Sequence, residues 1–233
     1  MKKIVIKEFS QIGNYHYQKK EENQDYYLMN EDENYIVVTL ADGVSTQKNG
    51  LLGAKTACKT TSEYVLRRAS DFMLYDKEEV SKYILKEVLY ELEKLSQAQN
   101  EEIESYSSTL LTLIYDKNNQ EGILMNLGDG VVLGSKKQKY FYVSKGRNIQ
   151  GSTFVTTSND AYRNMEICKF KSEECDRLLL GTDGIKEYLK NIKSKKDIDY
   201  EAVKKKVTQQ LPYDDCSFIE IKFVNVAKRK KSL

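Results

Sequence analysis

The chain has 233 residues, of which 40% are hydrophobic and 31% charged, and its formal net charge is +2 at pH 7. This composition suits a folded protein rather than a disordered one, and the small net charge gives no indication of a nucleic-acid partner. No stretch reaches the ~20 apolar residues that cross a bilayer. The first residues, MKKIVIKEFS, lack the long apolar segment and small-residue cleavage site of a signal peptide. We therefore expect a cytoplasmic protein that does not associate with membranes.

Cysteine and histidine content limits the metal chemistry that the chain can support. The four cysteines, Cys58, Cys168, Cys175 and Cys216, form no CxxC pair and have no spacing typical of zinc ligands. We expect reduced and mostly buried thiols. His16 is the only histidine, which excludes a two-histidine zinc site within one chain and predicts a surface or packing role.

The first half of the chain combines strands and helices. Residues 4–9, 25–30 and 35–43 have the composition of strands, and a turn-rich segment joins the second to the third. Apolar residues then recur at helical spacing over residues 51–68, and more regularly over residues 77–98. Two long helices in succession predict an antiparallel pair that covers one face of a sheet.

The second half changes to alternating patterns and short apolar runs, which predict consecutive antiparallel strands joined by tight turns. The predicted strands are residues 108–116, 121–130, 131–137 and 139–146, followed by strand-like character at residues 151–159, 166–171 and 177–184. Short helices are predicted around residues 185–191 and 200–210. In residues 214–224, Ile219, Ile221 and Phe223 alternate with Glu220 and Lys222, which predicts a strand with one buried face.

Runs of antiparallel strands with segregated helices favour a layered α+β fold over a parallel sheet. No linker rich in proline, glycine or serine interrupts the chain, so we expect one domain over residues 1–226. Residues 227–233, AKRKKSL, form a basic C-terminal tail that we expect to be solvated.

Three Asp-Gly pairs follow apolar strands, at Asp42, Asp129 and Asp183. Turn chemistry alone explains many such pairs, but a loop after a buried strand is also where a rigid scaffold presents functional side chains. Together with Asp25 and Asp214, these positions can be interpreted as a carboxylate-built metal site. Magnesium and manganese prefer oxygen ligands, and clustered carboxylates repel one another unless a cation lies between them.

The motifs KEENQD, LADGVS, SSTLL, NLGDG, LLLGTDG and DDCS occur in this order between residues 4 and 223. Their order and spacing resemble the metal-dependent protein phosphatases of type 2C, the PPM family, and especially its compact bacterial members. Each motif is short, but six in the same order are specific. The resemblance implies a four-layer α-β-β-α sandwich, in which helices flank two antiparallel sheets, with a metal centre at one end.

The resemblance also implies roles for individual residues. Asp42 would bridge two Mg²⁺ or Mn²⁺ ions, the Gly43 carbonyl would bind one ion, and Asp183 and Asp214 would hold the other. Asp25 matches the acidic residue that orients a metal-bound water, so Asp25 and Asp42 are the candidate catalytic residues. A hydroxide bridging the two metals would then attack the phosphorus, and no protein nucleophile is required.

Other positions match the family less closely. Asp129 matches the aspartate of a third metal position, although GDG is also an ordinary hairpin turn. Lys20 stands in place of the phosphate-binding arginine, which keeps the charge but loses the bidentate geometry. Gln24 replaces a glutamate, and Val44 replaces a proposed general-acid histidine. Asp215 is expected to be a turn residue or an acceptor beside Asp214.

The resemblance implies a protein phosphatase that hydrolyses phosphoserine and phosphothreonine. Its expected partners are a phosphorylated protein substrate and a cognate serine/threonine kinase, and we expect a monomer. Two alternatives stay open at this point, a non-catalytic relative that serves as a binding or regulatory module and a phosphomonoesterase for small molecules. Residues 146–176 are unlike the usual flap of the family, so the sequence does not define the substrate.

Overall fold

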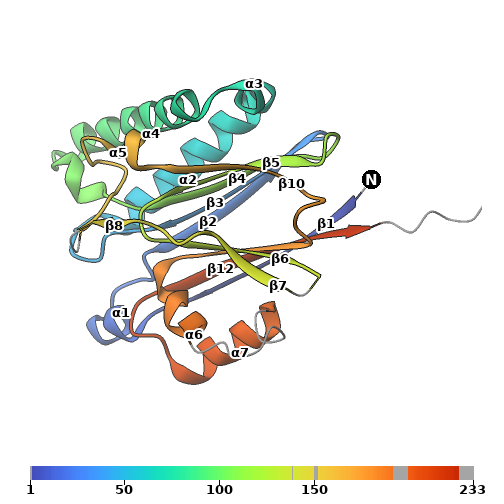
Figure 1. The fold of residues 1–233 in the computed structure, drawn as a ribbon. Helices are drawn as coiled ribbons and strands as arrows, with labels where there is room; N and C mark the ends of the chain where they lie inside the picture. Colours follow the sequence, from blue (N-terminus) through green and yellow to red (C-terminus); the bar gives the residue numbers. More distant parts are fainter. Residues whose placement is uncertain (1, 138, 150–151, 191–198, 226–233) are drawn as a thin grey trace, which may run out of the picture.

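The computed structural model describes residues 2–137, 139–149, 152–190 and 199–225. It contains two five-stranded sheets in which all strand pairs are antiparallel, and these sheets lie face to face (Figure 1). The first sheet has the order β1 (Lys2–Gln11), β12 (Cys216–Asn225), β11 (Arg177–Gly181), β6 (Val131–Lys136) and β7 (Lys139–Ser144). The second has the order β10 (Glu166–Lys171), β5 (Glu121–Leu127), β4 (Leu110–Asp116), β3 (Tyr35–Asp42) and β2 (Asp25–Glu31). A small ribbon pairs β8 (Asn148–Ile149) with β9 (Ser152–Thr153).

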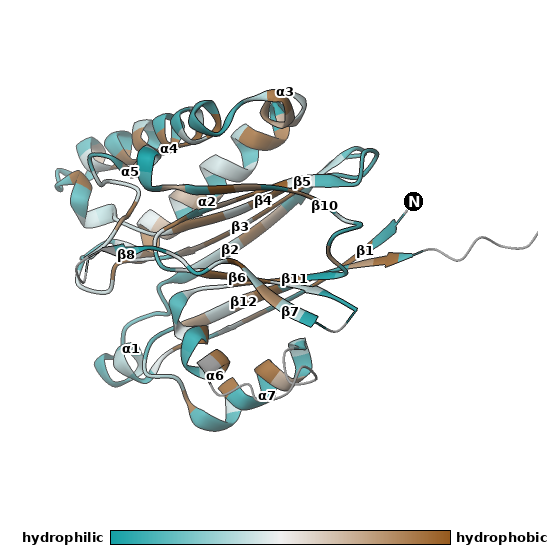
Figure 2. Ribbon diagram, in the orientation of Figure 1, coloured by the Kyte–Doolittle hydropathy of each residue, from teal (hydrophilic) through white to brown (hydrophobic). Residues whose placement is uncertain are grey.

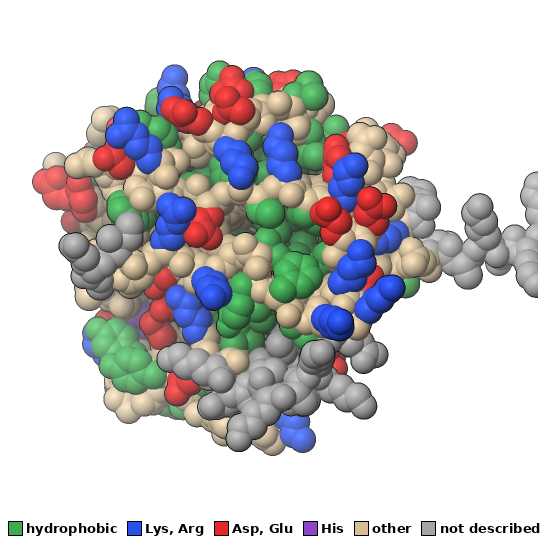
Figure 3. All heavy atoms as spheres, in the orientation of Figure 1, with side chains coloured by type: hydrophobic (Ala, Val, Ile, Leu, Met, Phe, Trp, Pro, Cys, Tyr) green, Lys and Arg blue, Asp and Glu red, His purple; other side chains and the backbone are tan. Residues whose placement is uncertain are grey.

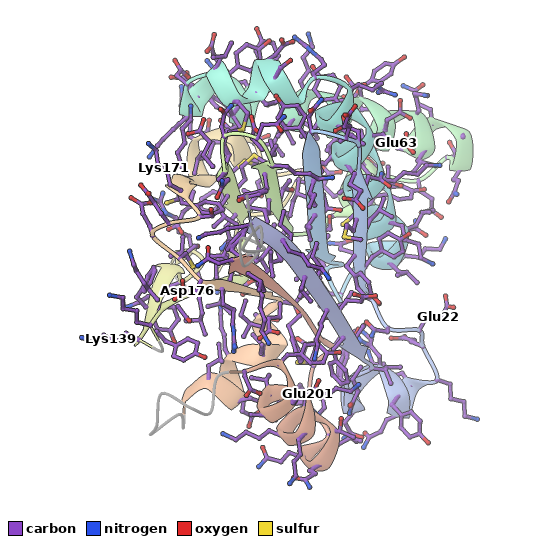
Figure 4. The ribbon with its side chains drawn as sticks, turned by 90° about the vertical axis from the view of Figure 1, so that its right-hand side faces the viewer. Glu22, Glu63, Lys139, Lys171, Asp176 and Glu201 are labelled. Atoms are coloured by element: carbon purple, nitrogen blue, oxygen red, sulfur yellow. The ribbon has the colours of Figure 1, made fainter. Side chains whose placement is uncertain are left out.

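Helices cover both outer faces of this double sheet. One outer layer contains α2 (Gly50–Arg67), α3 (Ala69–Leu74), α4 (Lys77–Gln99), η1 (Ile103–Tyr106) and α5 (Ala161–Asn164). The other contains η2 (Asp183–Ile185), α6 (Lys186–Lys190) and α7 (Tyr200–Gln210), while α1 (Asn14–Lys19) lies at one end. Glu63 on α2 and Glu201 on α7 lie on opposite sides of the molecule (Figure 4). The predicted four-layer α-β-β-α sandwich is therefore confirmed.

Hydrophobic clusters fill the spaces between the four layers. The central cluster lies between the sheets and includes Val38, Leu113 and Ile219, all almost inaccessible to solvent. A second cluster packs α2 and α4 on the outer face of β3, β4 and β5, and a third packs α6 and α7 against the other sheet. Hydrophobic residues accordingly follow the strands of both sheets in Figure 2. Acidic and basic side chains are interspersed on the surface in view in Figure 3.

The two long helices follow from their sequence patterns. The predicted segments 51–68 and 77–98 correspond closely to α2 and α4, which share one hydrophobic cluster. A capping box fixes the start of α4, because the Asp76 carboxylate accepts from the Glu79 amide and the Glu79 carboxylate accepts from the Asp76 amide. The helical prediction 200–210 coincides with α7, while residue 191 of the segment predicted at 185–191 lies outside the described residues.

Several predictions about individual elements were wrong. Strand β12 is buried on both faces rather than one, because α7 covers the side that carries Glu220, and that carboxylate is 1% exposed beside Arg177 and Lys222. Strands β5 and β6 were expected to be neighbours in one antiparallel sheet because they are consecutive in sequence, but they belong to different sheets. Within residues 152–159, only Ser152 and Thr153 form a strand.

Short helices were also missed, because α1, α3 and α5 contain only four to six residues each. Segments this short carry less than two turns of helical periodicity.

The two ends of the sandwich differ in structure. In Figure 1, α1, the loop between β3 and α2, and β8 gather at the left-hand end, whereas the N-terminus and the end of β12 lie at the right. The left-hand end also receives the Asp-Gly corners that follow β3 and β11. In the described residues, no helix has the length and apolar character needed to span a membrane. The predicted basic tail, residues 227–233, lies outside the described residues.

Candidate metal centre

Strand pairing brings the first two candidate aspartates together. In the β2–β3 ladder, Asp25 lies directly opposite Asp42, so both side chains leave the same face of the sheet. Asp25 is 6% exposed, and its Oδ2 accepts a hydrogen bond from the Thr182 hydroxyl at 2.9 Å. Thr182 follows β11 of the other sheet, so this hydrogen bond connects the two sheets at the site.

The corner after β3 is held by short backbone contacts. The Asp42 amide donates to Thr109 Oγ1 at 2.9 Å, and the Gly43 amide donates to the Gln24 carbonyl at 3.1 Å. A Cβ atom on Gly43 would lie 2.3 Å from the Gly50 carbonyl carbon, so only glycine fits at this position.

Asp183 reaches the same region from the first sheet, the one that contains β11. It begins η2 directly after β11, and a side-chain hydrogen bond links it to Asp42. Burial, together with the charges of Asp129 and Asp214, raises the pKa of Asp183 to about 6. The ammonium group of Lys186, on α6, acts in the opposite direction.

Asp214 lies in the loop before β12, next to an aspartate with a different role. Burial raises the pKa of Asp214, and the neighbouring charges of Asp215 and Asp129 also raise it, whereas His16 lowers it. Asp215 is 1% exposed and its two oxygens accept from the Gly13 amide at 2.7 Å and the Gln24 amide at 2.6 Å. Asp215 is therefore a structural acceptor beside Asp214, as one of the two sequence-based expectations proposed.

His16 completes this anchor from helix α1. Its side chain is 1% exposed, and its Nδ1 lies 2.8 Å from Asp215 Oδ2. The first turn of α1 also packs on the same loop, because the Asn14 and Tyr15 amides donate to the Pro212 and Tyr213 carbonyls. The expected packing role for His16 is thus found at the site rather than at a distance from it.

Asp129 approaches from the turn between β5 and β6. Its Oδ2 accepts a hydrogen bond from the Thr153 hydroxyl of β9 at 3.1 Å. Gly128 adopts a φ of +108°, which favours glycine, and its carbonyl accepts from the Arg147 amide at 2.7 Å. The β8–β9 ribbon is therefore attached to the aspartate turn.

Electrostatics indicate that all five aspartates face a common region. Burial raises the pKa of Asp42 well above its usual range, and the charges of Asp25, Asp183, Asp214 and Asp129 raise it further. Burial likewise raises the pKa of Asp25, and hydrogen bonds from Ser217 and Thr182 oppose that rise. Carboxylates that raise one another's pKa in this way favour a bound proton or a cation.

The residues fit a hard divalent cation by their donor chemistry. Asp25 Oδ1 and Asp183 Oδ1 are buried and have no hydrogen-bond partner among the described residues. Such oxygen donors suit Mg²⁺ and Mn²⁺. In the described parts of the chain, however, no three histidine, cysteine, aspartate or glutamate side chains form a ready-made metal-binding group.

The candidate phosphate residue lies beside this centre rather than within it. Lys20 ends α1 in the left-handed conformation, with φ 60°, and its side chain is exposed in a groove that Gln24 also lines. Gln24 Oε1 is buried without a partner among the described residues. Val44, which stands in place of a histidine, is half-buried and its amide donates to the Ser107 carbonyl at 3.0 Å.

Sequence reasoning missed Thr182, Thr109 and Thr153 as partners of the aspartates. The sequence could have identified Thr182, because this residue belongs to the LLLGTDG motif and directly precedes Asp183. Thr109 likewise belongs to the SSTLL motif, whereas no local pattern identifies Thr153, whose aspartate partner is 24 residues away. Cys216 is buried as expected, burial raises the pKa of its thiol, and all four cysteines are free.

Comparison with solved structures identifies proteins of the same fold. A bacterial serine phosphatase matches with a TM-score of 0.71 and 14% identity, covering 96% of this chain and 99% of that one. The serine/threonine phosphatase Stp1 from Staphylococcus aureus matches with a TM-score of 0.70 and 13% identity over 96% of both chains. RsbX, solved in complex with magnesium, matches with a TM-score of 0.60 and 13% identity, covering 96% of this chain and 100% of that one.

Sequence comparison gives the family directly. No curated protein sequence matches the chain. The family model described as protein phosphatase 2C matches residues 12–213, which include every candidate residue except Asp214. This match covers most of the 233 residues, and the fold agrees with it. The chain belongs to the protein phosphatase 2C family.

Proposed function

We propose that the protein is a metal-dependent phosphatase that hydrolyses phosphoserine and phosphothreonine in proteins. The observation that carries this proposal is a group of aspartates at one end of the sandwich. Burial and neighbouring carboxylates raise the pKa of Asp25, Asp42, Asp183 and Asp214, and the charge of Asp129 contributes to the rise at the last three. Membership of the family supports the same reaction.

The proposed ligands are oxygen donors from four corners of the fold. Asp42 and the Gly43 carbonyl would serve the first of two Mg²⁺ or Mn²⁺ ions, with Asp42 shared, and Asp183 and Asp214 would serve the second. Asp129 would hold a third ion. When bound, such ions provide a nucleophile from water near neutral pH and neutralise charge on the phosphate during in-line attack.

Asp25 is the residue proposed to orient the attacking water. Its Oδ2 is held by the Thr182 hydroxyl, whereas its Oδ1 has no partner among the described residues and can accept a hydrogen bond. A carboxylate fixed through one oxygen presents the other in a defined direction, which favours orientation of a small reactant. Lys20, exposed at the edge of the site, is proposed to bind the phosphate as a single positive charge.

The proposed setting follows from the family and the composition. We propose a single domain over residues 1–226 that acts as a monomer in the cytoplasm, on phosphoproteins supplied by a serine/threonine kinase. The structural neighbours include serine/threonine phosphatases, which supports this substrate class. The interspersed surface charge gives no reason to propose nucleic-acid binding.

One assay tests the proposal. We expect Mn²⁺-dependent hydrolysis of an aryl phosphate by the intact protein, and its loss by at least about a hundredfold in Asp42→Ala and Asp183→Ala. Glu63→Ala, at an exposed position of α2, is the control and keeps the activity.

Absence of hydrolysis together with absence of Mn²⁺ binding by calorimetry would contradict the enzymatic proposal and favour a binding module. Hydrolysis of aryl phosphate but of no phosphopeptide would instead favour a small-molecule substrate.

A further inference from the structure

A large open groove adjoins the candidate metal centre. It has a volume of about 990 Å³ and is bounded by the end of α1, the loop after β3 and the first turns of α2. Its charged lining consists of four lysines and two glutamates, Lys19, Lys20, Lys48, Lys55, Glu21 and Glu22. Glu22 projects at the edge of the molecule in Figure 4. The groove therefore carries an excess of positive charge next to a strongly acidic centre.

Two of the four lysines already have partners. Lys19 Nζ lies 3.8 Å from the centre of the Tyr15 ring and bonds the hydroxyl of that ring, while Lys48 forms an ion pair with Glu101. Lys20 and Lys55 are both exposed, and within the described parts of the chain neither ammonium group has an ion-pair or hydrogen-bond partner. These two cations are available to an anionic ligand.

The segment around Gln24 separates the groove from the candidate metal centre and contacts both. Gln24, which lines the groove, directly precedes Asp25, and its carbonyl accepts from the Gly43 amide. A Cβ atom on Gly50 would lie 2.6 Å from Gln24 Oε1 and 3.1 Å from the Gly43 carbonyl carbon. A chain bound along the groove would therefore pass within contact of the loop that presents Asp42.

The dimensions of the groove indicate what kind of ligand it fits. A phosphoryl group alone fills a small part of about 990 Å³. Beyond the lysines, the loop provides Ser45, Thr46 and Gln47, which can exchange hydrogen bonds with a polypeptide backbone.

We propose that this groove binds the polypeptide segment that flanks the phosphorylated residue, and that Lys55 selects substrates with acidic residues in that segment. The inference rests on the proposed phosphatase function and adds a substrate preference to it. Lys55 acts by charge attraction outside the reacting group, so it determines specificity rather than chemistry.

The test compares two phosphopeptides of equal length that differ only in having glutamate or glutamine around the phosphothreonine. For binding, a non-hydrolysable phosphonate replaces the phosphate, and fluorescence anisotropy is measured with Mn²⁺ at low salt. We expect the intact protein to bind the acidic peptide about two- to fivefold more tightly, as for an exposed ion pair. This ratio should approach one at about 1 M salt, where the Debye length is about 3 Å.

Charge reversal on α2 provides the decisive pair of variants. Lys55→Glu should reverse the preference, so that the glutamine peptide binds more tightly. Lys59 is exposed one helical turn beyond Lys55 and does not line the groove. Lys59→Glu should therefore keep the ratio of the two peptide affinities found for the intact protein. Equal binding of both peptides by the intact protein, or the same ratio in Lys55→Glu and Lys59→Glu, would overturn the inference.

Hydrolysis of the phosphate forms of the two peptides separates this inference from the proposed function. Tighter binding of the acidic peptide without hydrolysis of either peptide would contradict the phosphatase function and support the proposed peptide-binding role of the groove. If both peptides are hydrolysed and both bind with equal affinity, the phosphatase function is supported and the proposed preference of the groove for acidic peptides is contradicted.

Discussion

Neutralising Asp183 should stabilise the metal-free protein while removing its ability to gain stability from Mn²⁺. Burial and neighbouring carboxylates raise the pKa of Asp183 to about 6, about two units above the ordinary value for aspartate. At about 1.4 kcal/mol per unit, the ionised form in the folded protein is unfavourable by up to about 3 kcal/mol at pH 7.5. Asp183→Asn removes that charge and keeps a donor for the hydrogen bond with Asp42.

The pH dependence follows from the raised pKa of this acid. Below about pH 4, Asp183 is protonated in both folded and unfolded chains, so the charge does not oppose folding. Between about pH 4 and pH 6 the unfolded chain releases this proton while the folded protein retains it, so the free energy of unfolding falls, and the fall levels off above about 6. The advantage of Asp183→Asn should therefore grow from near zero at pH 4 to up to about 3 kcal/mol above pH 6.

Urea unfolding in EDTA between pH 4 and pH 8 measures this difference, with Glu63→Gln at an exposed position of α2 as the control. In a second series, saturating Mn²⁺ should raise the urea midpoint of the intact protein and of Glu63→Gln. The midpoint of Asp183→Asn should rise much less. The reasoning would be refuted if Asp183→Asn were no more stable than the intact protein in EDTA at pH 7.5, or if its advantage did not depend on pH.

Three further substitutions test contacts that support the site and the helices. Gly53→Ala should lower the free energy of unfolding by about 1–3 kcal/mol, because the added Cβ would lie 1.9 Å from the Tyr106 carbonyl oxygen; an increase, as expected for an ordinary helical glycine, would disprove this packing. Asp76→Ala removes the capping box of α4 and should cost about 1 kcal/mol in urea unfolding, and an unchanged midpoint would show that the cap does not contribute. His16→Ala should destabilise by about 1–3 kcal/mol, because it leaves buried Asp215 without its imidazole neighbour; equal thermal midpoints for variant and intact protein would argue against this anchor.

Local sequence patterns were sufficient for the long elements. The helices α2, α4 and α7 follow from apolar spacing, and the strands β3, β4 and β11 follow from short apolar runs ended by turns. These signals depend only on residues within one or two turns of each other, so they can be recognised without the fold. Patterns of this kind failed for α1 and for the segment after Thr153, where contacts with distant residues determine the backbone.

Burial of polar residues depended on the tertiary structure. Alternation along β12 correctly placed Ile219 and Ile221 in the core, but it predicted that Glu220 would face solvent. Glu220 is buried because α7 packs over it and Arg177 and Lys222 compensate its charge. Nothing within β12 itself reveals that a helix will cover that face.

For the candidate centre, the sequence by itself determined which residues we propose as metal ligands, because an aspartate followed by glycine at the end of an apolar strand is a local feature. Asp42, Asp129 and Asp183 were identified in this way, and the order of the motifs supported Asp25 and Asp214. Only the tertiary structure decided that these carboxylates approach one another, that Asp25 lies opposite Asp42, and that His16 reaches Asp215. The reason is that strand order and helix packing join positions up to about two hundred residues apart, and no local periodicity records such contacts.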